Sequence, residues 1–184
     1  MTKLEDLSRE LKNIPEDYIV LVETNAEKAF EVALSIVKVL TEKHDYGIIV
    51  SANRPYVNLL NIYQRNNIDI SKVFIVDLIS KNQNADFEAE NVMFVENASS
   101  LTDISLSVNR RIKEFEGQKF VFIDSLTTML IHNDPYVFAR FIHSVLTRMR
   151  LNSVGGVMVS LTDRTNREIR AEIAQLCDRV IKVT

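Results

Sequence analysis

Two residues of this chain stand where phosphate and magnesium chemistry would take place. Asp124 directly follows the apolar run Phe120–Ile123, so its carboxylate is expected at the end of a buried strand, where it could hold Mg²⁺ through water. Lys28 is expected near the start of the helix that follows the first strong strand, where an ammonium group can contact a phosphate. Many buried strands end in an aspartate, so the pattern at Asp124 needs support from other positions.

The loop that carries Lys28 lacks the rest of a phosphate-binding motif. Such a loop has the pattern G-x-x-x-x-G-K-[ST], in which bare backbone N–H groups surround the phosphates. Here Val22 and Glu27 occupy the two glycine positions, and Ala29 replaces the hydroxyl residue. The sequence therefore predicts a lysine without the backbone groups that would bind a phosphate. The four glycines of the chain lie elsewhere, at Gly47, Gly117, Gly155 and Gly156.

The residues from Thr24 to Glu27 favour a helix start that is already capped. In this pattern the threonine side chain accepts a hydrogen bond from the third amide of the helix, and the glutamate reaches back to the amide of the capping residue. Glu27 would also place a negative charge at the positive end of the helix dipole. An incoming phosphate would then meet occupied donors and a carboxylate, so we expect a closed site.

Composition limits the classes of protein to consider. A length of 184 residues with 46% hydrophobic content is enough for one domain, which we place at residues 1–184. The net charge of -3 gives no basic surface for nucleic acid, so a nucleic-acid partner is not expected. The single cysteine, Cys177, fits a reducing compartment, and no segment has the apolar pattern of a signal peptide or membrane span. We therefore expect a cytoplasmic protein without membrane contact.

Strand-like and helix-like segments alternate along the chain, which is typical of a parallel sheet with helices on both faces. The strand-like segments are short, rich in Val, Ile and Phe, and not alternating, as expected when both faces are buried. The expected strands are Tyr18–Val22, Tyr46–Val50, Val73–Leu78, Lys119–Ile123, Gly155–Leu161 and Arg179–Val183, with Val92–Val95 as an edge strand. The expected helices are Leu4–Asn13, a helix ending near Lys43, one opened by Pro55, then Leu101–Glu116, Tyr136–Arg150 and Arg167–Cys177.

Several other residues have plain structural explanations. Asp134 is expected to begin a helix rather than to bind a metal with His132, and Cys177 is expected to be a small core residue. A basic cluster is expected to be a solvated face paired with Glu168 and Glu172 rather than a nucleic-acid patch. Its members are Arg148, Arg150, Arg164, Arg167 and Arg170.

The segment Asp124-Ser125-Leu126-Thr127, together with the apolar strand before it, resembles the I-D-S-L-T signature of the RecA/KaiC-like P-loop ATPases. Ile14–Glu23 resembles the family's segment that leads into the P-loop, and Asp178–Val183 resembles its closing strand. The chain is identified as a degenerate member of this superfamily that lacks a Walker A motif. The resemblance implies a three-layer RecA-like fold with a predominantly parallel sheet, in which strand 155–161 lies between strands 18–22 and 119–123. It also implies that any nucleotide would be bound by Thr24, Asn25, Lys28, Asp124 and Ser125, with Mg²⁺ on Asp124.

The chain departs from the family at the position of the catalytic base. Active members resemble one another in carrying one or two glutamates after the second strand, where this chain has Ser51-Ala52-Asn53-Arg54. The expected function is a non-catalytic, pseudo-ATPase domain without a cofactor, with a regulatory or assembly role through protein partners or self-association. The alternative is an ATP- and Mg-binding protein or slow ATPase that uses Lys28 and Asp124, with Arg164 neutralising charge. A third hypothesis is a small-ligand or nucleic-acid sensor that uses the polar ends of the strands, although the acidic pI counts against nucleic acid.

Overall fold

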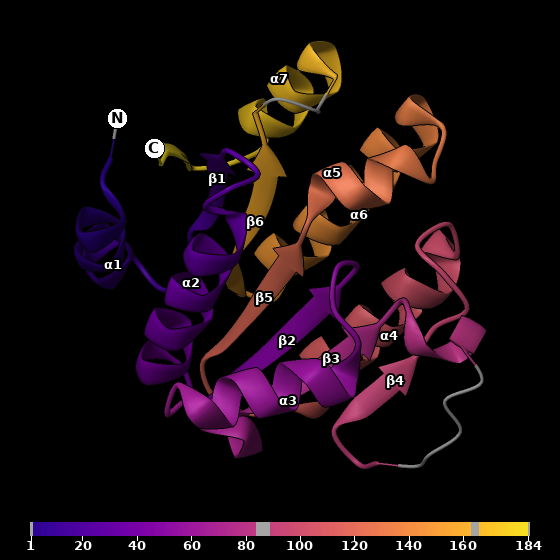
Figure 1. The fold of residues 1–184 in the computed structure, drawn as a ribbon. Helices are drawn as coiled ribbons and strands as arrows, with labels where there is room; N and C mark the ends of the chain where they lie inside the picture. The colour runs from indigo at the N-terminus through magenta and orange to yellow at the C-terminus, as the bar shows by residue number, and fades with distance from the viewer. Residues whose placement is uncertain (1, 84–88, 163–165, 184) are drawn as a thin grey trace.

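The computed structural model describes residues 2–83, 89–162 and 166–183. Its strands form one seven-stranded sheet in the order β4-β3-β2-β5-β6-β1-β7, and every pair within it is parallel (Figure 1). The predicted strands are confirmed, including Val92–Phe94 at one edge and the position of β6 between β1 and β5. The strands are β1 (Ile19–Thr24), β2 (Tyr46–Ser51), β3 (Val73–Asp77), β4 (Val92–Phe94), β5 (Lys119–Asp124), β6 (Gly155–Leu161) and β7 (Arg179–Lys182).

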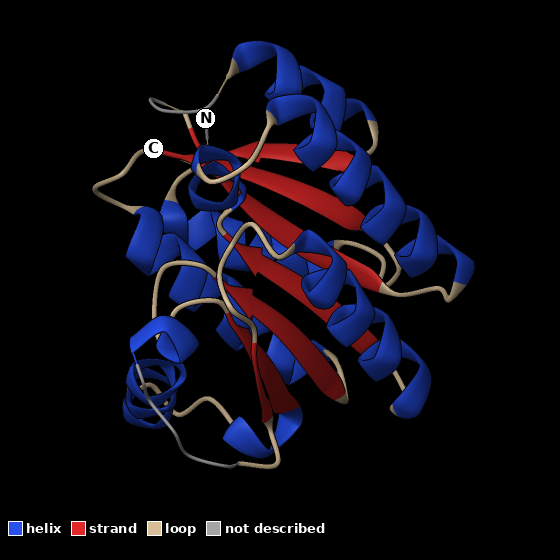
Figure 2. Cartoon of the chain, turned by 90° about the vertical axis from the view of Figure 1, so that its right-hand side faces the viewer, coloured by secondary structure: helices blue, strands red, loops and turns tan. Residues whose placement is uncertain are grey.

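Helices cover both faces of the sheet and make a three-layer α/β fold of the RecA-like type (Figure 2). Alternate residues of each central strand enter two separate cores, because successive side chains of a strand point to opposite faces. Helices α1 (Leu4–Asn13), α2 (Ala29–Lys43) and α3 (Tyr56–Arg65) share one core with Val20 and Phe122. Helices α4 (Leu101–Glu114), α5 (Leu126–Ile131), α6 (Pro135–Leu151) and α7 (Arg167–Gln175) share the other with Leu21 and Ile123.

Two sequence-based expectations about helices need correction. Helix α2 begins only at Ala29, because β1 stays in the sheet through Thr24, which pairs with Leu161 of β6. Helix α5 was not expected, because its six residues are separated from β5 by Ser125 alone. Ser125 caps the helix, since its side chain accepts a hydrogen bond from the amide of Thr128. The expected loop from Lys81 begins within a short 3₁₀ turn, Ser80–Gln83, and residues 84–88 of it lie outside the described residues.

The adjacent glycines at the start of β6 are explained by the crowding between β1 and β5. A Cβ at Gly155 would overlap the backbone carbonyl oxygen of Glu16, and a Cβ at Gly156 would overlap that of Val121. The neighbouring atoms are backbone, so they cannot move aside as a flexible side chain can. Glycine is therefore used here for close strand packing and not for phosphate binding.

The first and last described residues meet at the β7 edge of the sheet, where Thr2 forms a parallel bridge with Val183. Helix α1 is fastened to the same edge by an ion pair between Glu10 and Arg179. Within residues 2–83, 89–162 and 166–183, no helix has the length and apolar character needed to cross a membrane.

Candidate functional site

A polar pocket of about 250 Å³ opens where β2, β5 and β6 end. Ligands of open parallel sheets bind beyond these carboxyl ends, so the pocket has the position expected of a functional site. Ala26, Ala29 and Phe30 contribute from the α2 side, and Leu161 from the end of β6. The polar groups that line it are Asn53, Arg54, Asp124, Ser125 and Thr128.

Asp124 is the carboxylate at the centre of the polar residues. Its Oδ1 accepts a hydrogen bond of 2.7 Å from Nδ2 of Asn53, and Oδ1 of Asn53 accepts one of 2.5 Å from the Thr128 hydroxyl. These contacts arise because β2 and β5 are neighbours with Ser51 opposite Asp124. The second carboxylate oxygen, Oδ2, has no hydrogen-bond or ion-pair partner within the described part of the chain.

The environment of Asp124 disfavours its charged form. Burial raises the pKa of the carboxyl from 3.8 to about 6, although the hydrogen bond from Asn53 and the charge of Arg54 act in the opposite direction. The buried phenol of Tyr63 lies near enough for the Asp124 charge to add to the effect of burial, and both raise the Tyr63 pKa well above its ordinary value. A carboxylate with a raised pKa in a pocket is a candidate for a functional group.

Arg54 is held over the mouth of the pocket by an aromatic ring. Its guanidinium carbon lies 4.3 Å from the ring centre of Phe30, a cation–π contact, and its Nη1 donates to Oδ1 of Asn58 at 3.3 Å. The Ser51 hydroxyl donates to the Arg54 carbonyl at 2.6 Å and fixes the turn that precedes α3. The pocket therefore contains a fixed positive group as well as a negative one.

A fully buried carboxylate, Asp77, positions the helix that follows this turn. Its Oδ2 accepts hydrogen bonds from the amide of Tyr56 at 2.7 Å and the hydroxyl of Ser80 at 2.5 Å. Its Oδ1 accepts from the amides of Ile79 at 2.7 Å and Ser80 at 2.9 Å. Asp77 thus joins the ends of β2 and β3 to the start of α3, and so holds the segment that carries Arg54.

The predicted capping box at the start of α2 is wrong. Thr24 is the last residue of β1, and its hydroxyl is fully buried without a hydrogen-bond partner in the described structure. The only side-chain bond in the turn runs from the Lys28 amide to Oδ1 of Asn25, at 3.0 Å. Glu27 is exposed and does not cap the helix. The sequence pattern failed because the strand extends two residues beyond its apolar run and takes Thr24 with it.

The start of α2 is therefore more open than the capping box implies. The amide of Val32 bonds to the Lys28 carbonyl. Residues 26–28 form a hydrogen-bonded turn before the helix, and no side chain caps the helix start. Uncapped N–H groups at a helix start are the general basis of anion binding.

The structure brings together some of the expected site residues and separates others. Asp124 and Ser125 line the pocket, whereas Thr24, Asn25 and Lys28 are not among its lining residues. Sequence reasoning did not single out Phe30 for this site, and it noted Thr128 only as one of the polar residues at the strand ends. It noted Asn53 and Arg54 as polar residues after a strand, but only the pairing of β2 with β5 shows that they lie beside Asp124.

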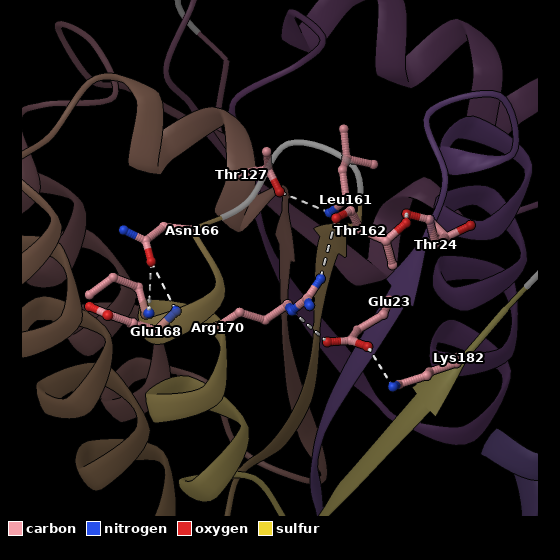
Figure 3. A network of polar contacts seen from close by, with 10 residues as sticks. Glu23, Thr24, Thr127, Leu161, Thr162, Asn166, Glu168, Arg170 and Lys182 are labelled. Atoms are coloured by element: carbon pink, nitrogen blue, oxygen red, sulfur yellow. Dashed lines mark hydrogen bonds and ion pairs between the residues drawn. The ribbon is translucent and has the colours of Figure 1, made fainter.

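The basic cluster is exposed at Arg148, Arg150 and Arg167, as expected of a solvated face, but its ion pairs are not the expected ones. Arg170 forms an ion pair with buried Glu23 at 3.2 Å, and Lys182 lies 3.7 Å from the same carboxylate (Figure 3). Arg150 pairs with Asp178 at 3.2 Å. These partners, rather than Glu168 and Glu172, tie α7, β7 and α6 to β1. Arg164 lies outside the described residues.

Two of the plain structural explanations agree with the structure. Asp134 caps α6 by accepting hydrogen bonds from the amides of Tyr136 and Val137, both at 3.0 Å. Burial raises the pKa of the Cys177 thiol to about 12, which makes it a poor nucleophile. Within the described ranges, no group of three or more His, Cys, Asp or Glu residues is placed to hold a metal ion.

Comparison with known families decides the classification. Residues 19–183 match DUF7504, a family of unknown function. The chain belongs to this family. No curated protein matches this DUF7504 chain.

Two solved structures from an archaeon have a similar fold. The uncharacterized protein PH0321 from Pyrococcus horikoshii, in complex with an unknown peptide, is similar with a TM-score of 0.73 at 14% identity, over 99% of this chain and 84% of that one. The KaiC-like protein PH0186 from Pyrococcus horikoshii OT3 is similar with a TM-score of 0.63 at 14% identity, over 92% of this chain and 72% of that one. The DUF7504 chain therefore has a RecA/KaiC-like fold.

Proposed function

We propose that this protein is a non-catalytic KaiC-like domain with a regulatory or assembly role that it carries out through protein partners or self-association. The observation that carries the proposal is the single carboxylate among the described lining residues of the pocket. Asp124 would be needed for Mg²⁺, and the described lining residues include no second carboxylate that could activate a water molecule. Lys28 also stands apart from the lining residues, so the two groups that could act on ATP are not gathered around one cavity.

Exposed apolar side chains near the carboxyl ends of the strands support a partner-binding role. Ile131, Tyr136 and Val137 are 67%, 72% and 44% exposed at the corner between α5 and α6 (Figure 1). Apolar residues that gather on a surface are typical of protein contact sites. PH0321, which has a similar fold, was solved in complex with an unknown peptide, and this also supports a protein or peptide partner.

The first test is hydrolysis and binding of ATP in the presence of Mg²⁺. We expect no turnover and no heat of binding from the wild-type chain. Turnover that is lost in Asp124→Ala, with the fold intact by circular dichroism, would overturn the non-catalytic assignment.

The second test concerns association. If the α5–α6 corner binds a second copy, sedimentation of the double variant Ile131→Ser, Tyr136→Ser should show less association than the wild type. Leu151→Ser is the matched control, because Leu151 is 80% exposed at the opposite end of α6. A wild-type chain that stays monomeric at all concentrations would restrict the role to binding of other proteins.

One observation favours the alternative of an ATP- and Mg-binding protein. Ala29 and Phe30, in the first turn of α2, line the pocket, and no side chain caps this turn, so a phosphate there would meet uncapped backbone donors without a glycine-rich loop. Asp124 would then hold Mg²⁺ through water, and Lys28 or Arg54 would supply positive charge. Calorimetric binding of ATP with Mg²⁺ that weakens in both Asp124→Asn and Lys28→Gln would establish this alternative.

A further inference from the structure

The pocket presents two opposite charges whose hydrogen-bonding capacity is incompletely used. Oδ2 of Asp124 has no partner within the described residues, while Oδ1 is occupied by Asn53. The Arg54 side chain has five N–H donors and makes one hydrogen bond, to Asn58. Phe30 keeps the guanidinium in place by stacking, so the donors are held at the mouth of the pocket.

A third polar side chain lies behind the pocket. Tyr63 is 3% exposed. It lines a slot of about 10 Å³ whose wall also includes Phe30, Arg54 and Asp124. A slot of this size holds one water-sized group at most.

These charges limit the class of ligand. A simple cation on Asp124 is opposed by the nearby charge of Arg54, and a simple anion on Arg54 is opposed by Asp124. A divalent metal alone is disfavoured, because the described residues contain no cluster of three ligating side chains. A molecule with an ammonium group and a neighbouring carboxyl or carbonyl oxygen satisfies both side chains at once.

The volume limits the size of the ligand. About 250 Å³ is below the ~300–1,000 Å³ of clefts that bind drug-sized molecules. We propose that this pocket binds an α-ammonium group next to a carboxyl or carbonyl oxygen, as in a free α-amino acid or the first residue of a peptide. The ammonium is bound by Asp124 and the Thr128 hydroxyl, and the oxygen by Arg54. This ligand site goes beyond the proposed partner role and does not depend on it.

The test is calorimetric titration at ligand concentrations up to about 10 mM, with alanine, alaninamide, trialanine and N-acetylalanine as probes. We expect binding of the probes that keep the ammonium group and none of N-acetylalanine, in which that charge is removed. Asp124→Asn should weaken binding by about tenfold or more, because a charged hydrogen-bond acceptor becomes neutral. Asp17→Asn, at an exposed aspartate without a described ion pair, is the matched control and should bind as the wild type does.

Arg54→Gln identifies the source of the ligand, with Arg65→Gln at the exposed end of α3 as its control. A loss for alanine that exceeds the loss for alaninamide and trialanine indicates a free amino acid, since only alanine has a carboxylate for Arg54. Equal losses indicate a peptide terminus.

Affinity should also fall as the pH drops below about 6, because Asp124 becomes protonated there. The proposal is overturned if no probe binds, if N-acetylalanine binds equally well, if Asp124→Asn binds as the wild type does, or if crystals grown with alanine show only water on Asp124 and Tyr63.

Discussion

Replacing Asp124 with asparagine should stabilise the protein at neutral pH, although it removes a hydrogen-bonded side chain from the pocket. The asparagine oxygen can still accept the hydrogen bond from Asn53, while the buried charge disappears. The rise of the Asp124 pKa from 3.8 to about 6 corresponds to about 3 kcal/mol between the ionised and protonated forms. We expect a gain of about 1–3 kcal/mol near pH 8, because part of this cost is relieved by local relaxation.

The pH dependence of the effect has a definite sign. Below pH 3.8 the carboxyl is protonated in both the folded and unfolded chain, so it does not oppose folding. As the pH rises from 3.8 to about 6, the unfolded chain loses this proton first, and the free energy of unfolding falls. Above about pH 6 the group is ionised in both states and the whole cost is present. The wild type should therefore lose stability over this interval relative to Asp124→Asn.

Urea unfolding of both proteins at several pH values between about 3.5 and 8 measures the difference directly. The two stabilities should meet at the acid end and separate as the pH rises, while Asp17→Asn should follow the wild type throughout. A variant that is less stable than the wild type near neutral pH would show that Arg54 and Asn53 favour the carboxylate. The reasoning about a costly buried charge would then be refuted.

Three further substitutions test contacts elsewhere in the fold. Thr24→Val should raise the free energy of unfolding by about 1 kcal/mol, because it removes a buried hydroxyl without a partner, and a decrease would revive the capping role. Asp77→Ala should cost about 3 kcal/mol or more, since four donors lose their acceptor, and urea unfolding that shows less than about 1 kcal/mol would mean that water replaces the carboxylate. Gly156→Ala should cost about 1–3 kcal/mol by overlap with Val121, and an unchanged melting temperature would show that β5 and β6 can separate.

The strands could be predicted from sequence because both faces of the sheet are buried. The central strands therefore contain apolar runs such as Ile48–Val50 and Phe120–Ile123, which are typical of buried strands. The position of β6 between β1 and β5 followed from the resemblance of Asp124-Ser125-Leu126-Thr127 to a known signature. The periodicity of apolar residues does not predict which strands are neighbours, because strands that pair are far apart in the chain.

The site was predicted less well, for two physical reasons. The end of β1 is set by hydrogen bonds to β6, so the polar residue Thr24 stays in the strand where a local rule places it at a helix start. The neighbours of Asp124 come from three separate segments, and Asn53, Phe30 and Thr128 become a group only when the sheet is formed. Local patterns identify single groups, whereas the hydrogen bonds and charges around them depend on tertiary structure.

The position of β1 has a consequence for how the chain reaches its native state. Its neighbours are β6 and β7, which follow it by more than a hundred residues, whereas β2 and β3 pair across a single helix. During synthesis the β2–β3 unit can form early, but β1 has no strand to pair with until Gly155–Leu161 has emerged. Until then its apolar residues can be covered only by α1 and α2. The N-terminal strand is thus among the last to be fixed in the sheet, and loss of the residues that follow β6 would remove β7 and leave β1 at an open edge.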